Sequence, residues 1–146
     1  MELNVYPFDL ALRYPFSISR HTYDVMKTVI VEMKKGRYTG FGEATTNPYY
    51  QSTQENLIEA FESAAGILSS VHVAQPAELW PDLEQATAGQ YFALSALDCA
   101  AYDLAGKMHG RSFGYQFGID YNKYPFTSYT LGIGKEEEIR AKIRDF

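Results

Sequence analysis

Residues 93–110 read ALSALDCAAYDLAGKMHG and contain the most regular pattern in the chain. Asp103 and Lys107 are four residues apart, a spacing that brings opposite charges side by side on a helix. Gly110 can end such a helix in the left-handed conformation. An apolar stripe at helical spacing consists of Ala93, Ala96, Leu97, Ala100, Ala101, Leu104 and Met108. The pattern predicts a helix over residues 90–108, and its small alanines allow close packing against a neighbour.

The stretch upstream of this helix, residues 28–45, reads TVIVEMKKGRYTGFGEAT. The β-branched residues over 28–34 indicate a strand. Residues 35–37 indicate a turn, in which Gly36 can adopt a positive φ. Residues 38–45 then form the returning strand, so we expect a β-hairpin over residues 28–45.

Residues 2–14 form another expected strand, because Phe8, Leu10 and Leu12 alternate with the residues between them. Pro7 and Pro15 bracket this strand, and proline favours the edge or the ends of a sheet. Residues 16–27 and 46–51 are polar and irregular, so we expect both to be loops. The first 45 residues therefore predict a three-stranded antiparallel meander.

The rest of the chain predicts helices and one more strand. Ser52 and Glu55 are spaced as a capping box, which starts a helix that continues through Leu68. A shorter helix is expected over residues 77–88, with Pro81 in its first turn. After a connector over residues 111–124, we expect a strand to residue 133 and a helix over 135–146. A parallel strand needs a partner that this chain does not supply. Strands followed by helices predict an α+β fold for residues 1–122.

Composition excludes several classes of protein. The 146 residues are 46% hydrophobic and 21% charged, as in a folded globular domain. The net charge is −5 without a long run of Lys or Arg, so we expect no nucleic-acid partner. No apolar stretch approaches the roughly 20 residues that span a bilayer, and no signal peptide is recognised. We therefore expect no membrane contact and a cytoplasmic location. Cys99 is interpreted as a small buried side chain.

Residue patterns alone indicate no active site. The histidines at positions 21, 72 and 109 lack a His or Cys two to four positions further on, so metal-site spacing is absent. Only His21, in the expected loop, is a functional candidate among them. The glycine pairs 40/42 and 132/134 lack the third glycine of a dinucleotide-binding motif and are interpreted as turn or bulge glycines. No G-x-S-x-G motif of a serine nucleophile occurs.

Three stretches resemble one known family, the enolase superfamily. They are the hairpin 28–45 with its G-x-G-E ending, the helix 93–110, and residues 127–134 (TSYTLGIG). The resemblance implies an enolase N-terminal-like capping domain over residues 1–122. Residues 123–146 resemble the first strand and helix of a (β/α) barrel that is truncated here. The loop 47–52, the Arg20 loop after Pro15-Phe16 and the strand 127–133 are most similar to the muconate-lactonizing subgroup and its dipeptide epimerases.

This resemblance implies a Mg²⁺-dependent isomerase that removes a proton α to a carboxylate. The Mg²⁺ ligands and catalytic lysines of such enzymes are expected beyond Phe146, so we expect no catalytic or metal-binding residue here and no activity of this chain alone. Residues 16–27 and 45–53 correspond to two lid loops that enclose the substrate. The expected substrate contacts are Phe16, Arg20, His21, Tyr23, Tyr49, Tyr50 and Thr130. Arg20 can pair with a substrate carboxylate.

The expected activity is epimerisation of dipeptides such as Ala-Glu. One alternative is a cycloisomerase or dehydratase of the muconate-lactonizing subgroup acting on another carboxylate. A second alternative, from a different class, is a noncatalytic binding module. Exchange of the α-proton of a dipeptide in D₂O separates an epimerase from a lactonizing enzyme. We also expect a homo-oligomer, with the small-molecule substrate as the other partner.

Overall fold

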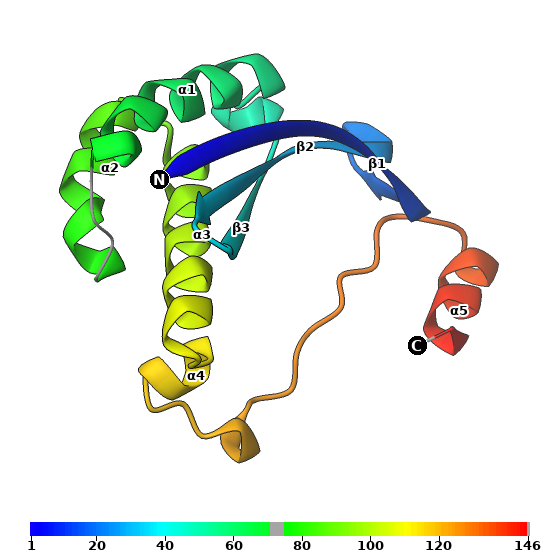
Figure 1. Cartoon of the computed structure of the whole chain (residues 1–146). Coiled ribbons are helices and arrows are strands. Elements are labelled where there is room, and N and C mark those ends of the chain that lie inside the picture. Colours follow the sequence, from blue (N-terminus) through cyan, green and yellow to red (C-terminus); the bar gives the residue numbers. More distant parts are fainter. Residues whose placement is uncertain (71–74, 146) are drawn as a thin grey trace.

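Three antiparallel strands form one sheet in the order β1–β2–β3 (Figure 1). They are β1 (Glu2–Ile18), β2 (His21–Lys35) and β3 (Tyr38–Thr45). In this computed structural model residues 1–70 and 75–145 are described, so His72 and Phe146 lie outside the described residues. The predicted meander is confirmed, and Gly36 in the β2–β3 turn has a φ of 60°.

The helices follow the sheet along the chain, as predicted. They are η1 (Pro48–Tyr50), α1 (Gln54–Ser70), η2 (Pro76–Leu79), α2 (Trp80–Thr87), α3 (Tyr91–His109), α4 (Phe113–Gln116), η3 (Tyr121–Lys123) and α5 (Glu136–Arg144). Gly110 ends α3 with a φ of 63°, and Pro81 lies in the first turn of α2. The short helices α4 and η3 interrupt the predicted connector. The α+β class is therefore confirmed.

One face of the sheet packs against α1 and α3, and α2 packs against these two helices. The helix-facing residues of β2 are Val29, Val31 and Met33, all fully buried. The same core contains Leu57, Phe61 and Leu68 of α1 and Leu97 and Leu104 of α3. On β1 the alternation is as predicted, but Phe8 and Leu10 are exposed because they lie on the other face. Leu3 and Val5 are the β1 residues that pack against the core.

The closest approach in this core is the seam between β3 and α3. A Cβ atom on Gly40 would collide with the backbone carbonyl oxygen of Ala100, and one on Gly42 with that of Ala96. These glycines are therefore not turn or bulge residues, as we had interpreted them. They remove side-chain volume where the helix backbone touches the strand, and the alanines do the same on the helix.

The ion pair predicted on α3 also completes the hydrogen bonding of β3. The Asp103 Oδ2 and Lys107 Nζ atoms are 2.6 Å apart. Asp103 Oδ2 accepts the backbone N–H of Phe41 at 2.9 Å, and Lys107 Nζ donates to the carbonyl of Thr39 at 2.9 Å. One donor and one acceptor at the sheet edge are thus satisfied by side chains of a helix.

The predicted loop 16–27 is wrong, because these residues extend β1 and β2 into a long hairpin. The turn is at Ser19 and Arg20, and the strands are paired up to Ile18 and His21. The register shifts between Ala11 and Phe16, so four residues of β1 (12–15) lie opposite one residue of β2. Pro15 lies in this bulge, where its missing N–H costs no ladder hydrogen bond. The polar sequence concealed a hairpin whose end extends beyond α1, α2 and α3 (Figure 1).

Residues 124–133 form no strand in the described part of the chain. The segment runs extended from η3 back towards the hairpin (Figure 1), and the backbone N–H of Ile133 donates to the carbonyl of Ser17 at 2.8 Å. A strand requires a ladder of such bonds with a neighbour. Helix α5 follows as predicted and lies against the β1 bulge. There Lys142 Nζ donates to the carbonyl of Pro15 at 3.2 Å, and Asp145 contacts Arg13 and Tyr14.

Cys99 is exposed, so its interpretation as a buried residue is wrong. The alanine stripe of α3 faces β3, and position 99 falls on the outer side of the same helix. The thiol borders an open hollow of about 420 Å³ between α3 and α4, which Tyr102, Lys107 and Arg111 also line.

Candidate functional site

The end of the β1–β2 hairpin gathers three of the predicted contact residues on one face. Phe16 is paired with Tyr23, and Ile18 is paired with His21. Directly opposite residues of antiparallel strands point to the same side, and so do residues two apart. The His21 and Tyr23 rings meet edge to face with centroids 4.4 Å apart. The hairpin end therefore presents a compact, mainly aromatic face.

Arg20 lies in the turn at the end of this hairpin and is exposed. Within residues 1–70 and 75–145 we find no hydrogen bond or ion pair of its side chain. A guanidinium group that is not used internally keeps its donors for an external carboxylate, which it can bind with two parallel hydrogen bonds. This geometry suits the role expected for Arg20.

Thr130 lies beside the hairpin, on the extended segment that precedes α5. It borders a hollow of about 20 Å³ that Phe16, Tyr129 and Leu131 also line. Gly132 lies so close to the Ser17 backbone that a Cβ atom there would be 2.8 Å from the Ser17 nitrogen. The structure thus brings Thr130 into the neighbourhood of Phe16, although more than 100 residues separate them in sequence.

The loop between β3 and α1 closes on itself. The Asn47 N–H donates to the Ser52 carbonyl at 2.9 Å, and the Ser52 N–H donates back to the Asn47 carbonyl at 3.0 Å. The side chain of Asn47 caps the short helix between them by accepting the N–H of Tyr49 at 3.0 Å. Hydrogen bonds within residues 47–52 therefore close the loop, which also makes contacts to the neighbouring helices.

This loop presents Tyr49 and Tyr50 to solvent. Their side chains are 84% and 64% exposed, and the two rings meet edge to face with centroids 4.9 Å apart. The Tyr50 ring also packs against the Phe92 ring at the start of α3, with ring centroids 5.7 Å apart. Exposed tyrosines held in this way offer apolar faces and hydroxyl groups to a ligand.

The helix start that follows differs from the predicted capping box by one position. Thr53 and Asn56 form the reciprocal pair: the Thr53 N–H donates to Asn56 Oδ1 at 2.8 Å, and the Asn56 N–H donates to Thr53 Oγ1 at 3.3 Å. Ser52 is tied to Asn47 instead, and its hydroxyl is buried without a hydrogen-bond partner. The Asn56 amide also donates to the carbonyl of Gln51 at 2.6 Å.

The two groups of aromatic residues are separate. The backbone carbonyl of Lys27 accepts the N–H of Thr46, where the 47–52 loop begins. His21 and Lys27 are six residue steps apart on β2, which corresponds to about 20 Å of extended strand. Phe16, His21, Tyr23 and Thr130 thus form one group, and Tyr49 and Tyr50 form another.

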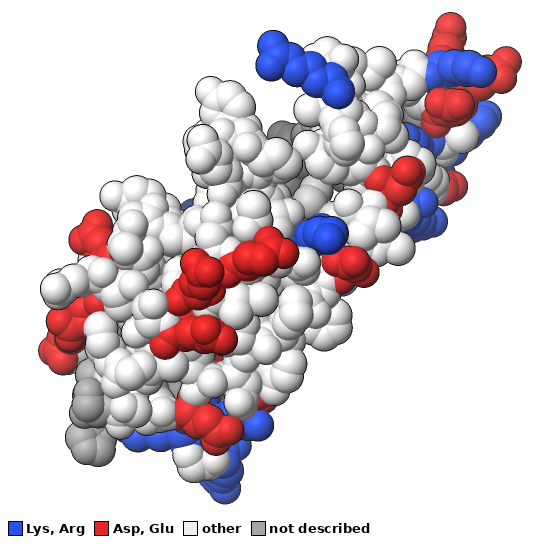
Figure 2. Space-filling view, turned by 90° about the horizontal axis from the view of Figure 1, so that it is seen from above, with Lys and Arg blue, Asp and Glu red and all other residues white. Residues whose placement is uncertain are grey.

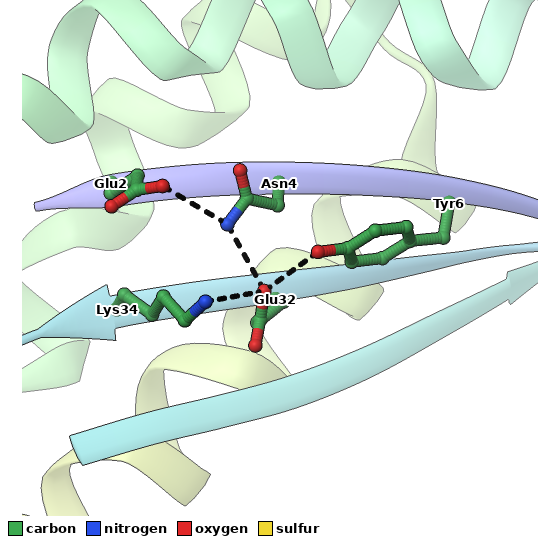
Figure 3. A network of polar contacts seen from close by, with 5 residues as sticks. All are labelled: Glu2, Asn4, Tyr6, Glu32 and Lys34. Carbon is green, nitrogen blue, oxygen red and sulfur yellow. Dashed lines mark hydrogen bonds and ion pairs between the residues drawn. The ribbon is translucent and has the colours of Figure 1, made fainter. Parts of the chain in front are cut away.

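A polar cluster lies on β1 and β2 at the end away from the hairpin turn, and its side chains are drawn in Figure 3. Glu32 is only 8% exposed and accepts hydrogen bonds from Asn4 Nδ2 at 3.0 Å and Tyr6 Oη at 2.9 Å. Lys34 Nζ lies 3.3 Å from the same carboxylate. The bond from Asn4 is the main cause that lowers the pKa of Glu32, and the bond to Glu32 raises the pKa of Tyr6. Because its donors come from β1 and β2 alone, we interpret the cluster as a structural link between the strands.

Charge is distributed unevenly over the molecule. Seen from above, acidic side chains lie over the middle, whereas the right-hand end, which holds the hairpin and α5, carries both signs (Figure 2). Within the described ranges no group of three His, Cys, Asp or Glu side chains could hold a metal ion. Among the described helices, none is both long and apolar enough to span a bilayer.

The family relationship follows from a comparison over the sheet and the three main helices. The family model for the N-terminal domain of mandelate racemase / muconate lactonizing enzyme matches residues 1–115.

The chain belongs to the mandelate racemase / muconate lactonizing enzyme family.

Two proteins that are similar in sequence to this chain are epimerases by name. The L-Ala-D/L-amino acid epimerase of Maribacter sp. is 35% identical over 99% of this chain and 43% of its own length. The L-Ala-D/L-Glu epimerase of Bacteroides thetaiotaomicron is 30% identical over 99% of this chain and 38% of its own length. The chain thus spans about two fifths of the length of these relatives.

A solved structure shares the fold of this chain. The dipeptide epimerase from Methylococcus capsulatus, complexed with Mg and the dipeptide L-Arg-D-Lys, superimposes with a TM-score of 0.86. The match covers 99% of this chain and 41% of that chain at 24% identity. The enolase-like N-terminal fold expected from the sequence is therefore confirmed.

Two residues that organise the 47–52 loop, Asn47 and Asn56, were not predicted from the sequence. Asn47 before a proline is typical of a turn that its side chain caps, and Thr53-x-x-Asn56 has the spacing of a helix start. Both signals were present in the sequence, but the neighbouring Ser52-x-x-Glu55 has the same spacing and a stronger match to the motif.

Proposed function

We propose that this chain is the N-terminal, substrate-enclosing part of a Mg²⁺-dependent dipeptide epimerase. The observation that carries the proposal is the 35% identity, over 99% of this chain, to an L-Ala-D/L-amino acid epimerase. In this proposal residues 1–122 are the capping domain, and residues 123–146 are the first strand and helix of a barrel. The extended segment without a ladder is consistent with a strand whose neighbours lie outside the chain.

In this proposal the residues of the chain bind and enclose the dipeptide. Arg20 binds a substrate carboxylate, and the aromatic face of Phe16, His21 and Tyr23 covers one side of the substrate and excludes water. Tyr49 and Tyr50 cover the other side. Thr130, next to Phe16, offers a hydroxyl group from the first barrel strand.

Proton transfer is assigned to no residue of this chain. In such an enzyme Mg²⁺ stabilises the negative charge that develops when the α-proton leaves. The described residues offer no cluster that fits this ion. We therefore propose that its ligands and the catalytic bases lie outside residues 1–146, and that the chain alone is inactive.

The test is α-proton exchange in D₂O. We would express the reading frame as it continues past codon 146 and incubate the protein with Mg²⁺ and a panel of L,L-dipeptides that includes L-Ala-L-Glu. The expected result is deuterium at one α-carbon and inversion of that centre, observed by NMR. Lactone formation from a muconate without dipeptide exchange would replace the proposal by a cycloisomerase. A stop codon directly after Phe146 would favour a noncatalytic binding module.

We further propose a cytoplasmic homo-oligomer. Exposed apolar side chains on the open face of the sheet, among them Tyr6, Phe8, Leu10 and Phe41, support self-association. The lone cysteine has no disulfide partner within the chain and supports a reducing compartment. Light scattering of the purified protein tests the oligomer, and a monomeric mass would contradict it.

A further inference from the structure

We infer that Asn56 is a positioning residue that holds the 47–52 loop as a preformed rim for the substrate. The inference rests on the proposed function, in which Tyr49 and Tyr50 contact the dipeptide. Asn56 itself lies on α1, and its side chain bonds to Gln51, Thr53 and Gln90. It acts through the backbone of the loop that carries them.

The loop has a fixed shape, but its orientation depends on what joins it to the helices. The two backbone bonds between Asn47 and Ser52 close the loop internally. At its far end Gln51 has a φ of 55°, a left-handed conformation that a residue with a side chain rarely adopts. The neighbouring structure must supply the contacts that hold this conformation.

The side-chain amide of Asn56 supplies contacts of this kind through both its nitrogen and its oxygen. Its Nδ2 donates to the Gln51 carbonyl at 2.6 Å. Its Oδ1 accepts the N–H of Thr53 at 2.8 Å and the side-chain amide of Gln90 at 3.2 Å. A carboxylate has two acceptors and no donor. An aspartate at this position would keep the helix start but lose the bond to Gln51.

The same amide connects the loop to α3. Gln90 directly precedes α3 and Phe92 lies in its first turn, where Tyr50 contacts the Phe92 ring. Residue 56 thus orients the loop, through Gln51 and Gln90, towards the surface on which Tyr50 rests. Tyrosines that are already held need not be ordered when a ligand binds, so the arrangement favours substrate binding over the chemical step.

The decisive variant is Asn56→Asp. It replaces the side-chain NH₂ group by an oxygen and keeps the oxygen that accepts the N–H of Thr53. We expect the amide N–H groups of Tyr50, Gln51 and Ser52 to exchange with D₂O about tenfold faster in this variant of the 146-residue chain, as expected for one lost hydrogen bond. Gln85→Glu is the matched control, because it adds the same charge at an exposed position of α2 and should leave these amides unchanged. Unchanged exchange in Asn56→Asp would overturn the inference.

The kinetic test uses the complete epimerase. We expect Asn56→Asp to raise KM for its dipeptide about tenfold and to leave kcat within about twofold, since one hydrogen bond that orders the free enzyme is lost. A fall in kcat at constant KM would contradict a positioning role in binding. If the wild-type enzyme exchanges no dipeptide α-proton, the proposed function fails, and the amide-exchange result alone decides whether Asn56 holds the loop.

Discussion

The β3–α3 seam and the contact between the hairpin and α5 both join segments that are distant in sequence, but they are built differently. The seam is buried and brings backbone against backbone at Gly40 and Gly42. The hairpin contact is exposed and consists of polar groups around the β1 bulge, such as Lys142 and Asp145. The first needs small residues at fixed positions, and the second needs only charges within reach. Only the first can therefore make a large contribution to stability.

Gly42→Ala is the most direct test of whether the β3–α3 seam contributes more to stability than the hairpin contact does. The added Cβ would collide with the Ala96 carbonyl, so β3 and α3 must separate. We expect a loss of about 3 kcal/mol or more in the free energy of unfolding, because a backbone cannot move aside as a flexible side chain does. Chemical denaturation followed by circular dichroism measures it.

The control is Gly66→Ala on α1, where an added Cβ meets no atom within 4 Å. Here we expect up to about 1 kcal/mol of stabilisation, from the better helix propensity of alanine. Equal effects of the two substitutions would show that the seam is not the tight contact described above.

A smaller effect is expected from Asp103→Ala at the exposed border of the seam. The variant leaves the Phe41 N–H without its acceptor and Lys107 without its partner. Water can replace part of both interactions, so we expect a loss of about 1 kcal/mol. Denaturation at low and at high salt checks this value. A loss as large as that of Gly42→Ala would mean that the ion pair, and not close packing, holds the seam.

Glu32 adds an intermediate case between the buried seam and the exposed hairpin contact, because its side chain is polar but nearly buried. Its pKa is lowered in the folded protein, mainly by the hydrogen bond from Asn4, so the unfolded chain binds this proton more readily. The stability that the carboxylate contributes is present at neutral pH and is lost as the pH falls below about 4.3 and through the lowered pKa.

We therefore expect Glu32→Gln to flatten the acid side of the stability curve, measured as the denaturation midpoint between pH 7 and pH 3. The control is Glu59→Gln, at an exposed position of α1. If Glu32→Gln and the wild type lose stability in parallel, the network does not bind the charged form preferentially.

The smallest effect is expected from Asp145→Asn at the hairpin contact. The ion pair with Arg13 is exposed on both sides, and we expect the free energy of unfolding to change by less than about 0.5 kcal/mol. Amide exchange of residues 12–17 should nevertheless become faster, because the bulge loses its contact to α5. A stability loss above 1 kcal/mol would place this contact in the same class as the seam.

The sequence predicted those parts of the fold whose signals are local. The stripe of α3 and the β2–β3 hairpin with Gly36 are patterns within 20 residues, and both were confirmed. The hairpin end was missed because its polar residues are paired across a four-residue bulge that no periodicity reveals. Residues 124–133 have the composition of a strand, but their backbone bond to the hairpin is that of Ile133 to Ser17, and one such bond does not make a ladder.

In the candidate site, the residues expected to contact the substrate were predicted, but the residues that hold them in place were not. Arg20, Tyr49 and Tyr50 were named because the resemblance to the enolase superfamily implies two lid loops at residues 16–27 and 45–53; the residue patterns alone indicated no site. Asn56 was overlooked because its role depends on three backbone and side-chain partners that come together only in the folded chain. The roles of all these side chains in substrate binding stay predictions.

The two outer strands of the sheet differ in how far their backbone groups are already bonded, because Asp103 and Lys107 bond to the backbone of β3. At β3 a foreign strand would have to displace both groups before it could pair with Thr39 and Phe41. On β1, in the described part of the chain, Gln54, Ile133 and Lys142 donate to carbonyls from Phe8 onward, so the start of this strand is the part of the border left for a foreign strand. Growth of this sheet by strand addition, in a native assembly or in aggregation, is thus directed to β1.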